Sequence, residues 1–150
     1  MNVYDTLAAR GIQLPGARVP SALYEPFAIT GQLVFLSGHT ARQNGKPWVG
    51  QLGATMATEE GQLAARSVAI DLLGTLQAAV ADLNRVARIV KLMALVNSSA
   101  TFTEHHLVAN GASELLAGLF GSSGHARSAF GVAQIPHGAC IEIELIAELR

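Results

Sequence analysis

The stretch HARSAFGVAQIPHGACIEIELIAEL, residues 125–149, decides the fold. Its two apolar runs lie on either side of Pro136-His137-Gly138, which predicts two strands joined by a short loop. Arg127 begins the first run, and two glutamates, Glu142 and Glu144, alternate with isoleucines in the second. If the two strands are neighbours, an arginine and a carboxylate could hold a small charged molecule between them.

The composition is typical of a single globular domain. The chain has 150 residues, of which 50% are apolar and 14% charged. We therefore expect one domain over 1–150, with residues 1–19 forming a helix and a turn-rich extension. So few charges also indicate that part of the surface is buried against partner subunits. The net charge is -1 and no Lys/Arg cluster stands out, so we expect no nucleic-acid partner, because phosphate binding needs a basic surface.

Cysteine and histidine usage argue against several kinds of site. Cys140 is the only cysteine, which excludes an internal disulfide and a Cys-rich zinc site. His105 and His106 are adjacent in a predicted helix and diverge by about 100°, so we expect no metal site there or elsewhere. The N-terminus lacks a signal peptide, and the apolar stretch 89–96 is too short to cross a bilayer. We expect a cytoplasmic protein with no membrane partner.

The remaining elements follow from apolar periodicity, helix caps and glycines. In the first half we predict a helix over 3–10 ending at Gly11, strands over 24–30 and 32–37 hinged at Gly31, and a long loop over 38–55 in which 46–48 could open an edge strand. In the second half we predict a helix from an N-cap at Thr58 to about Asp82, in which Gly74 and many alanines indicate close packing on another element. A central strand over 85–97, a helix from a capping box at 101–104 to near Gly121, and a loop over 121–124 follow. After the first helix the order is ββαβαββ, an α+β fold with both long helices on one sheet face.

The last strand predicts what covers the sheet. Ile141, Ile143, Leu145 and Ala147 share one face, which suits a core. The opposite face carries Glu142, Glu144, Ile146 and Glu148. This second face is too apolar for free solvent, and the chain has no third layer for it. We therefore expect an oligomer in which sheet packs against sheet.

Arg127 and Glu142 each have more than one interpretation. By strand alternation Arg127 shares its face with small residues such as Ala129, so its guanidinium would overlook a hollow. It is an exposed arginine at a strand end, or it forms a structural ion pair with Glu142, or it is a bidentate clamp on a substrate carboxylate. Glu142 is either a solvated strand residue or a group that orients or deprotonates a water molecule.

A resemblance to a known family adds information. The run Ala126-Arg127-Ser128, followed by 132–147 with its Pro136, Gly138 and alternating Ile and Glu residues, closely resembles the C-terminal signature of the RidA/YjgF family. Tyr24 before a hairpin that ends in Leu36-Ser37-Gly38 resembles the first strands of that family. Asn110, four residues before Glu114, matches a helix asparagine of the family. The resemblance covers about residues 20–149.

Membership would imply a chorismate-mutase-like fold assembled as a homotrimer, with ligand clefts between subunits. It would also imply hydrolysis of 2-imino or 2-enamino acids to 2-oxo acids and ammonia, with no cofactor. The partners would be small carboxylates, namely the 2-imino acid substrate or the 2-oxo acid. Carried over to this sequence, the family roles make Arg127 the carboxylate ligand and Glu142 the group that positions water. Tyr24 would line the cleft from a neighbouring subunit, the amide of Gly38 would lie beside the ligand, and Asn110 would support the site.

The sequence also departs from the family. It adds the N-terminal helix and a longer loop over 40–55, which indicates a divergent branch. His39 stands where glutamine is usual and could add a titratable group beside the cleft. His125 replaces a common proline, and Ala129 replaces a frequent cysteine but can still supply its backbone carbonyl. Two alternatives therefore stay open: a non-catalytic protein that binds small carboxylates, and an endoribonuclease, which the lack of a basic surface disfavours.

Overall fold

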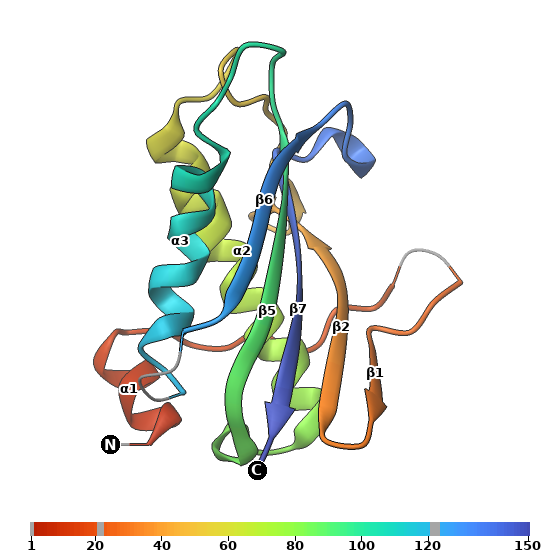
Figure 1. Cartoon of the computed structure of the whole chain (residues 1–150), viewed down its shortest axis with the longest axis vertical. Coiled ribbons are helices and arrows are strands. Elements are labelled where there is room, and N and C mark those ends of the chain that lie inside the picture. Colours follow the sequence, from red (N-terminus) through yellow and green to blue (C-terminus); the bar gives the residue numbers. More distant parts are fainter. Residues whose placement is uncertain (1, 21–22, 121–123) are drawn as a thin grey trace.

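Two long helices pack on the same face of a five-stranded sheet (Figure 1). The structure, a computed structural model, describes residues 2–20, 23–120 and 124–150. Its elements are α1 (Val3–Ala9), β1 (Phe27–Thr30), β2 (Leu33–Thr40), β3 (Arg42–Gln43), β4 (Lys46–Pro47), α2 (Thr58–Val80), the 3-10 turn η1 (Leu83–Arg85), β5 (Val86–Asn97), α3 (His105–Ala117), β6 (Ala126–Val132), the 3-10 turn η2 (Pro136–Gly138) and β7 (Ile141–Leu149). The sheet order is β1-β2-β7-β5-β6, and β3 and β4 pair separately. The predicted α+β fold is confirmed.

The core lies between the sheet and the helices, with β7 in the middle of the sheet. Ile141, Ile143, Leu145 and Ala147 are all at most 1% exposed, as their alternation predicts. Burying each of the three larger side chains, Ile141, Ile143 and Leu145, contributes about 1.5–3 kcal/mol, so this strand is a main source of stability. The expected two-faced character of β7 is therefore confirmed.

The two C-terminal strands are not neighbours, and the prediction that Arg127 and Glu142 lie on adjacent strands is wrong. β5 separates them: β6 runs parallel to β5, and β7 runs antiparallel to it. The crossover through α3 returns the chain parallel to β5, as a parallel pair requires. Residues 133–140 then connect β6 to β7 past the end of β5, and His137 and Gly138, with φ of 62° and 71°, turn the chain back.

The N-cap residues of α2 and α3 differ from the predicted ones. Thr58 is the first residue of α2 rather than its N-cap, which is Ala57, and the Ala57 amide donates to the Glu60 carboxylate. The Thr58 hydroxyl instead donates to the carboxylate of Glu104. The Glu104 carboxylate therefore accepts a hydrogen bond from α2 and does not cap α3. The capping box predicted over 101–104 is wrong, and α3 begins at His105 without a side-chain cap. The predicted helix end at Gly121 and most of the loop over 121–124 lie outside the described residues.

The segment 38–55 is more regular than the predicted loop. β2 continues to Thr40, and the β3–β4 hairpin follows it. Of these strands, the prediction included only a short edge strand near 46–48. Asn44 and Gly45 join β3 to β4 with φ of 55° and 74°, which is the Asn-Gly signal of a tight hairpin turn.

The N-terminal segment lies across α2 before it enters the sheet. A Cβ atom at Gly74 would overlap the carbonyl oxygen of Pro15, so glycine is needed where the two backbones meet. One turn earlier on α2, Asp71 forms an ion pair with Arg18. The close packing predicted from Gly74 is confirmed, and its partner is this segment, residues 11–20.

By length and composition, α2 is the one described helix that could cross a membrane. Its apolar window is 56% buried inside the domain, as in the core helix of a soluble protein.

The sheet face away from the helices exposes aromatic side chains. Phe35 of β2 and Phe130 of β6 are 39% and 44% exposed, and their strand partners there include Ile146 and Leu95. An apolar surface of this kind is what oligomers bury. The expected homotrimer stays a prediction.

Candidate functional site

A pocket of about 570 Å³ lies where β2 and β7 meet the N-terminal segment. This volume falls within the range of small-molecule sites. Five parts of the chain line the pocket: the end of β2, the start of β7, residues 18–20 with Tyr24 and Pro26, the β3 strand and the turn before β7. The lining includes four of the predicted site residues: Tyr24, Gly38, His39 and Glu142. A part of the predicted site is therefore assembled within one chain.

A β-bulge shapes the β2 wall of this pocket. Leu36 pairs with Leu145 and His39 pairs with Ile143, so two residues, Ser37 and Gly38, lie opposite the single residue Glu144. The extra residue shifts the alternation of the strand by one. His39 therefore points to the core side of the sheet, where an unbulged strand would turn it toward the open face.

The His39 imidazole is not a free titratable group beside the ligand, and that expectation is wrong. His39 is 3% exposed, and its Nδ1 lies 2.9 Å from the Ser37 carbonyl oxygen while its Nε2 lies 2.7 Å from Thr75 Oγ1. Because a carbonyl only accepts, Nδ1–H donates to Ser37 and Nε2 accepts from the Thr75 hydroxyl. Burial lowers the pKa of His39, which keeps the ring neutral.

Glu142 is the group best placed for proton transfer. Its side chain lies directly over Gly38, where a Cβ atom would come within 2.7 Å of Glu142 Oε1. Glycine therefore leaves the space that the carboxylate occupies. Burial, and secondarily the negative charge of Glu144, raise the pKa of Glu142. A carboxylate with a raised pKa is a stronger base toward water and a better proton donor at neutral pH than an ordinary one.

Arg127 lies on the other side of the sheet. It pairs with Leu92, a fully buried residue that faces the helices, whereas Glu142 pairs with Leu95 on the open face. Strand alternation thus places Arg127 and Glu142 on opposite faces, with β5 between them. No structural ion pair between them exists, and a clamp made by both within one chain is excluded.

The Arg127 guanidinium is held by α3. Its Nη1 donates to Asn110 Oδ1 at 2.8 Å and to Ser113 Oγ at 3.1 Å, and its Nη2 donates to the His106 carbonyl at 3.1 Å. Neutral acceptors fix its direction without cancelling its charge. Asn110, which the family resemblance makes a supporting residue, contacts Arg127 directly.

Other residues on that side extend the same network. Ser113 Oγ lies 2.8 Å from His125 Nε2, and burial, together with the charge of Arg127, lowers the pKa of His125. Ala129 follows Arg127 by two positions on β6 and pairs with Ala94. Arg127, Asn110 and Ala129 therefore form a second group, apart from the pocket that holds Tyr24, Gly38 and Glu142.

Two arginines in the pocket were missed by sequence reasoning. Arg18 comes from the N-terminal segment and Arg42 from β3, and both line the same cavity as Glu142. Arg18 lies in a turn-rich passage with no apolar periodicity, so no direct signal in the sequence marks it. The one related signal is Gly74, which predicts that some other element packs closely against α2. Among the residues that the structure describes, no three His, Cys, Asp or Glu side chains are grouped as a metal site requires.

The chain matches known proteins over nearly its whole length. Residues 5–149 match the family model described as "YjgF/chorismate_mutase-like, putative endoribonuclease". Protein TCP17 of Trypanosoma cruzi is 45% identical over 151 residues, covering 99% of this chain and 94% of TCP17. A crystal structure described as a "putative endoribonuclease" from Shewanella oneidensis is 31% identical, with a TM-score of 0.94 and coverage of 99% of this chain and 100% of that one. A protein of unknown function from Agrobacterium tumefaciens is 37% identical, with a TM-score of 0.90 and coverage of 99% and 92%.

Proposed function

This chain belongs to the RidA/YjgF family, also described as YjgF/chorismate-mutase-like, and on that premise we propose that it hydrolyses 2-imino and 2-enamino acids to 2-oxo acids and ammonia. The observation that carries the proposal is the Glu142 carboxylate, half-buried above Gly38 in the pocket between β2, β7 and the N-terminal segment and held at a raised pKa. The rest of the proposal concerns which residues act with it.

Water attacks C2 of the imine in this reaction. Glu142 takes a proton from the water as the C–O bond forms and passes it to the imine nitrogen, so that C=N becomes C–NH2 and C2 carries a hydroxyl group. Transfer of the remaining hydroxyl proton through Glu142 to the amino group then breaks the C–N bond, which releases ammonia and leaves the C2 carbonyl of the 2-oxo acid. A carboxylate that both accepts and returns a proton suits this sequence, because its raised pKa lies closer to neutral pH. The imine carbon is already electrophilic, so the reaction needs orientation more than activation.

The substrate carboxylate is bound by Arg127 of a neighbouring subunit. Within one chain Arg127 and Glu142 lie on opposite faces of the sheet, so a cleft that contains both requires two chains. Three hydrogen bonds to α3 occupy only part of the five N–H groups of Arg127, and the remaining ones can bind a carboxylate. Tyr24, which shares the pocket with Glu142, then faces Arg127 across the subunit boundary.

A homotrimer supplies that boundary. The exposed Phe35 and Phe130 on the open sheet face support association between copies, as does the low charge of the chain. A cyclic trimer repeats one heterologous contact three times, so each contact would make one complete cleft.

Turnover of 2-iminopropionate or 2-iminobutyrate, generated in situ, tests this function. We expect the wild type to accelerate formation of the 2-oxo acid, and we expect Arg127→Ala to abolish that acceleration. Arg66→Met, at an exposed position on α2, is the matched control and should behave like the wild type. Normal turnover by Arg127→Ala, or no turnover by the wild type, contradicts the proposal. Binding of 2-oxo acids without turnover would instead indicate a sensor, and tight, salt-dependent RNA binding would indicate a nuclease.

A further inference from the structure

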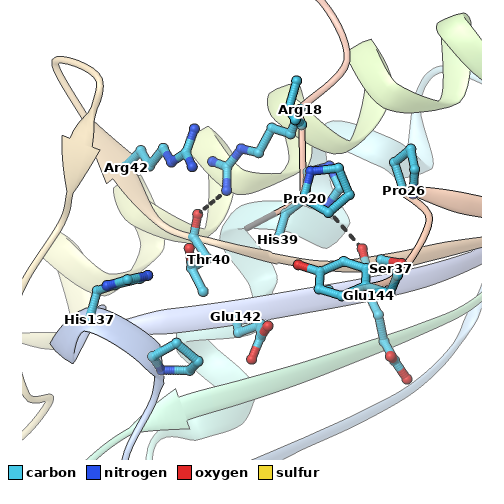
Figure 2. A pocket seen from close by; sticks show the side chains of 14 residues that line it. Arg18, Pro20, Pro26, Ser37, His39, Thr40, Arg42, His137, Glu142 and Glu144 are labelled. Carbon is cyan, nitrogen blue, oxygen red and sulfur yellow. Dashed lines mark hydrogen bonds between the residues drawn. The ribbon is translucent and has the colours of Figure 1, made fainter. Parts of the chain in front are cut away.

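Two guanidinium groups converge at one end of the pocket that Glu142 lines. Figure 2 shows the side chains of Arg18 and Arg42 approaching each other above Thr40, with Glu142 on the other side of the pocket. Arg18 comes from the N-terminal segment and Arg42 from the β3 strand. Two cations brought together from separate parts of the chain form a site that attracts an anion.

Arg18 is fixed in this position. Its Nη1 donates to the Thr40 carbonyl oxygen at 2.7 Å, and its Nη2 forms an ion pair with Asp71 of α2. The side chains of Arg18 and Asp71 are only 14% and 22% exposed. The crossing at Gly74 holds the same segment against α2. Arg18 is therefore set before any ligand arrives, which reduces the entropy lost on binding.

Arg42 supplies charge that the described part of the chain does not neutralise. No acceptor among the described residues hydrogen-bonds its guanidinium, whereas Arg18 has Asp71. Burial lowers the pKa of Arg18, and the nearby charge of Arg42 lowers it further, against the opposite effect of Asp71. The acidic residues that line the pocket, Glu142 and Glu144, belong to β7 at its other side. The pocket is thus cationic at one end and acidic at the other.

We propose that Arg18 and Arg42 form an anion subsite that binds the distal carboxylate of a 2-imino dicarboxylic acid, and likewise that of the corresponding 2-oxo dicarboxylic acid. The reaction at C2 and the binding of the first carboxylate by Arg127 rest on the proposed function. Because Arg127 takes that first carboxylate, the two pocket arginines are left for a second anionic group. The planar forks of two arginines suit a carboxylate, and about 570 Å³ accommodates a five-carbon diacid.

Calorimetric titration with two acids of equal chain length tests the subsite without requiring turnover. 2-Oxoglutarate and 2-oxopentanoate both have five carbons and differ by the distal carboxylate. We expect the wild type to bind 2-oxoglutarate about tenfold more tightly, as a charge-assisted bidentate contact would give. Arg42→Met should abolish this preference, and Arg66→Met should retain it. Arg42 is exposed, so its replacement leaves the fold intact, while Arg18 anchors the N-terminal segment and is left in place.

Each outcome separates the subsite from the reaction. Equal affinity of the wild type for both acids, or no binding of either, overturns the subsite. An equal loss of affinity for both acids in Arg42→Met shows that Arg42 binds the C1 carboxylate that the two acids share. This result also overturns the distal-carboxylate subsite. A clear preference for 2-oxoglutarate in a protein that hydrolyses no imine supports the subsite and contradicts the deaminase function alone.

Discussion

Replacing Gly111 by alanine should destabilise the protein, although helix propensity alone predicts the opposite. Gly111 lies inside α3, where alanine is about 1 kcal/mol more favourable than glycine. In the structure a Cβ atom at this position would overlap the carbonyl oxygen of Gln62 on α2 and lie 2.7 Å from its carbonyl carbon. The sign of the effect therefore depends on whether the two helices can move apart.

The size of the destabilisation depends on which atoms the new Cβ atom at position 111 would contact. Oxygen, carbon and Cα of Gln62 all belong to the backbone, so no side-chain rotation can relieve the overlap. Overpacking of a core costs about 1–3 kcal/mol and occasionally more, and a backbone clash lies at the upper end. After subtracting the propensity gain, we expect a net loss of about 2 kcal/mol. In a chain of this length that corresponds to a fall in Tm of roughly 4–8 °C.

Thermal and urea denaturation followed by circular dichroism measure this loss. Gly16→Ala is the matched control: it makes the same chemical change where a Cβ atom meets nothing within 4 Å. We expect Gly16→Ala to be neutral or slightly stabilising, because it reduces the entropy of the unfolded chain. A Gly111→Ala protein as stable as the wild type, or more stable, would refute the close α2–α3 contact.

Two further predictions concern the pocket. Glu142→Gln should raise Tm at neutral pH. Because the pKa of Glu142 is raised in the folded protein, folding favours its protonated form. The wild type therefore has its full stability below the pKa that Glu142 has in the unfolded chain and loses stability as pH rises through the pKa of the folded state. The advantage of Glu142→Gln should vanish below about pH 4, where both states are protonated, and an advantage independent of pH would contradict burial of the charge. Gly38→Ala should keep the fold, because the nearest atom is the flexible end of Glu142 at 2.7 Å, yet lower kcat/KM by roughly a hundredfold by displacing that carboxylate. Full activity in Gly38→Ala would contradict the role of this contact.

The order of the elements was predictable because it depends on local signals. Apolar alternation in β7 and the helical period of α2 both reflect burial on one face, which the sequence records directly. The pairing of β6 was not predictable from this pattern. A loop after β6 is compatible with a β6–β7 hairpin or with a connection that passes β5. The crossover through α3 places β6 parallel to β5 at the edge of the sheet, so the loop has to pass β5 to reach β7.

The candidate site was predictable in part for a related reason. The residues of the family motif were found, but their faces depend on register. A single bulge at Ser37-Gly38 turns His39 into the core, and nothing in the local sequence marks it. The arginines at positions 18 and 42 reach the pocket through long-range packing of the N-terminal segment and the β3–β4 hairpin. Such contacts leave no periodic signal.

Complementation between two inactive variants tests most directly whether the cleft is shared between subunits. Arg127→Ala and Glu142→Gln are each expected to lack imine hydrolysis. Mixed in equal amounts during co-expression, they would place an intact Arg127 and an intact Glu142 on opposite sides of some boundaries. Random assembly of a cyclic oligomer predicts recovery of about a quarter of wild-type turnover. Assembly of mixed oligomers with no recovered activity would contradict a site formed by Arg127 of one subunit and Glu142 of the next.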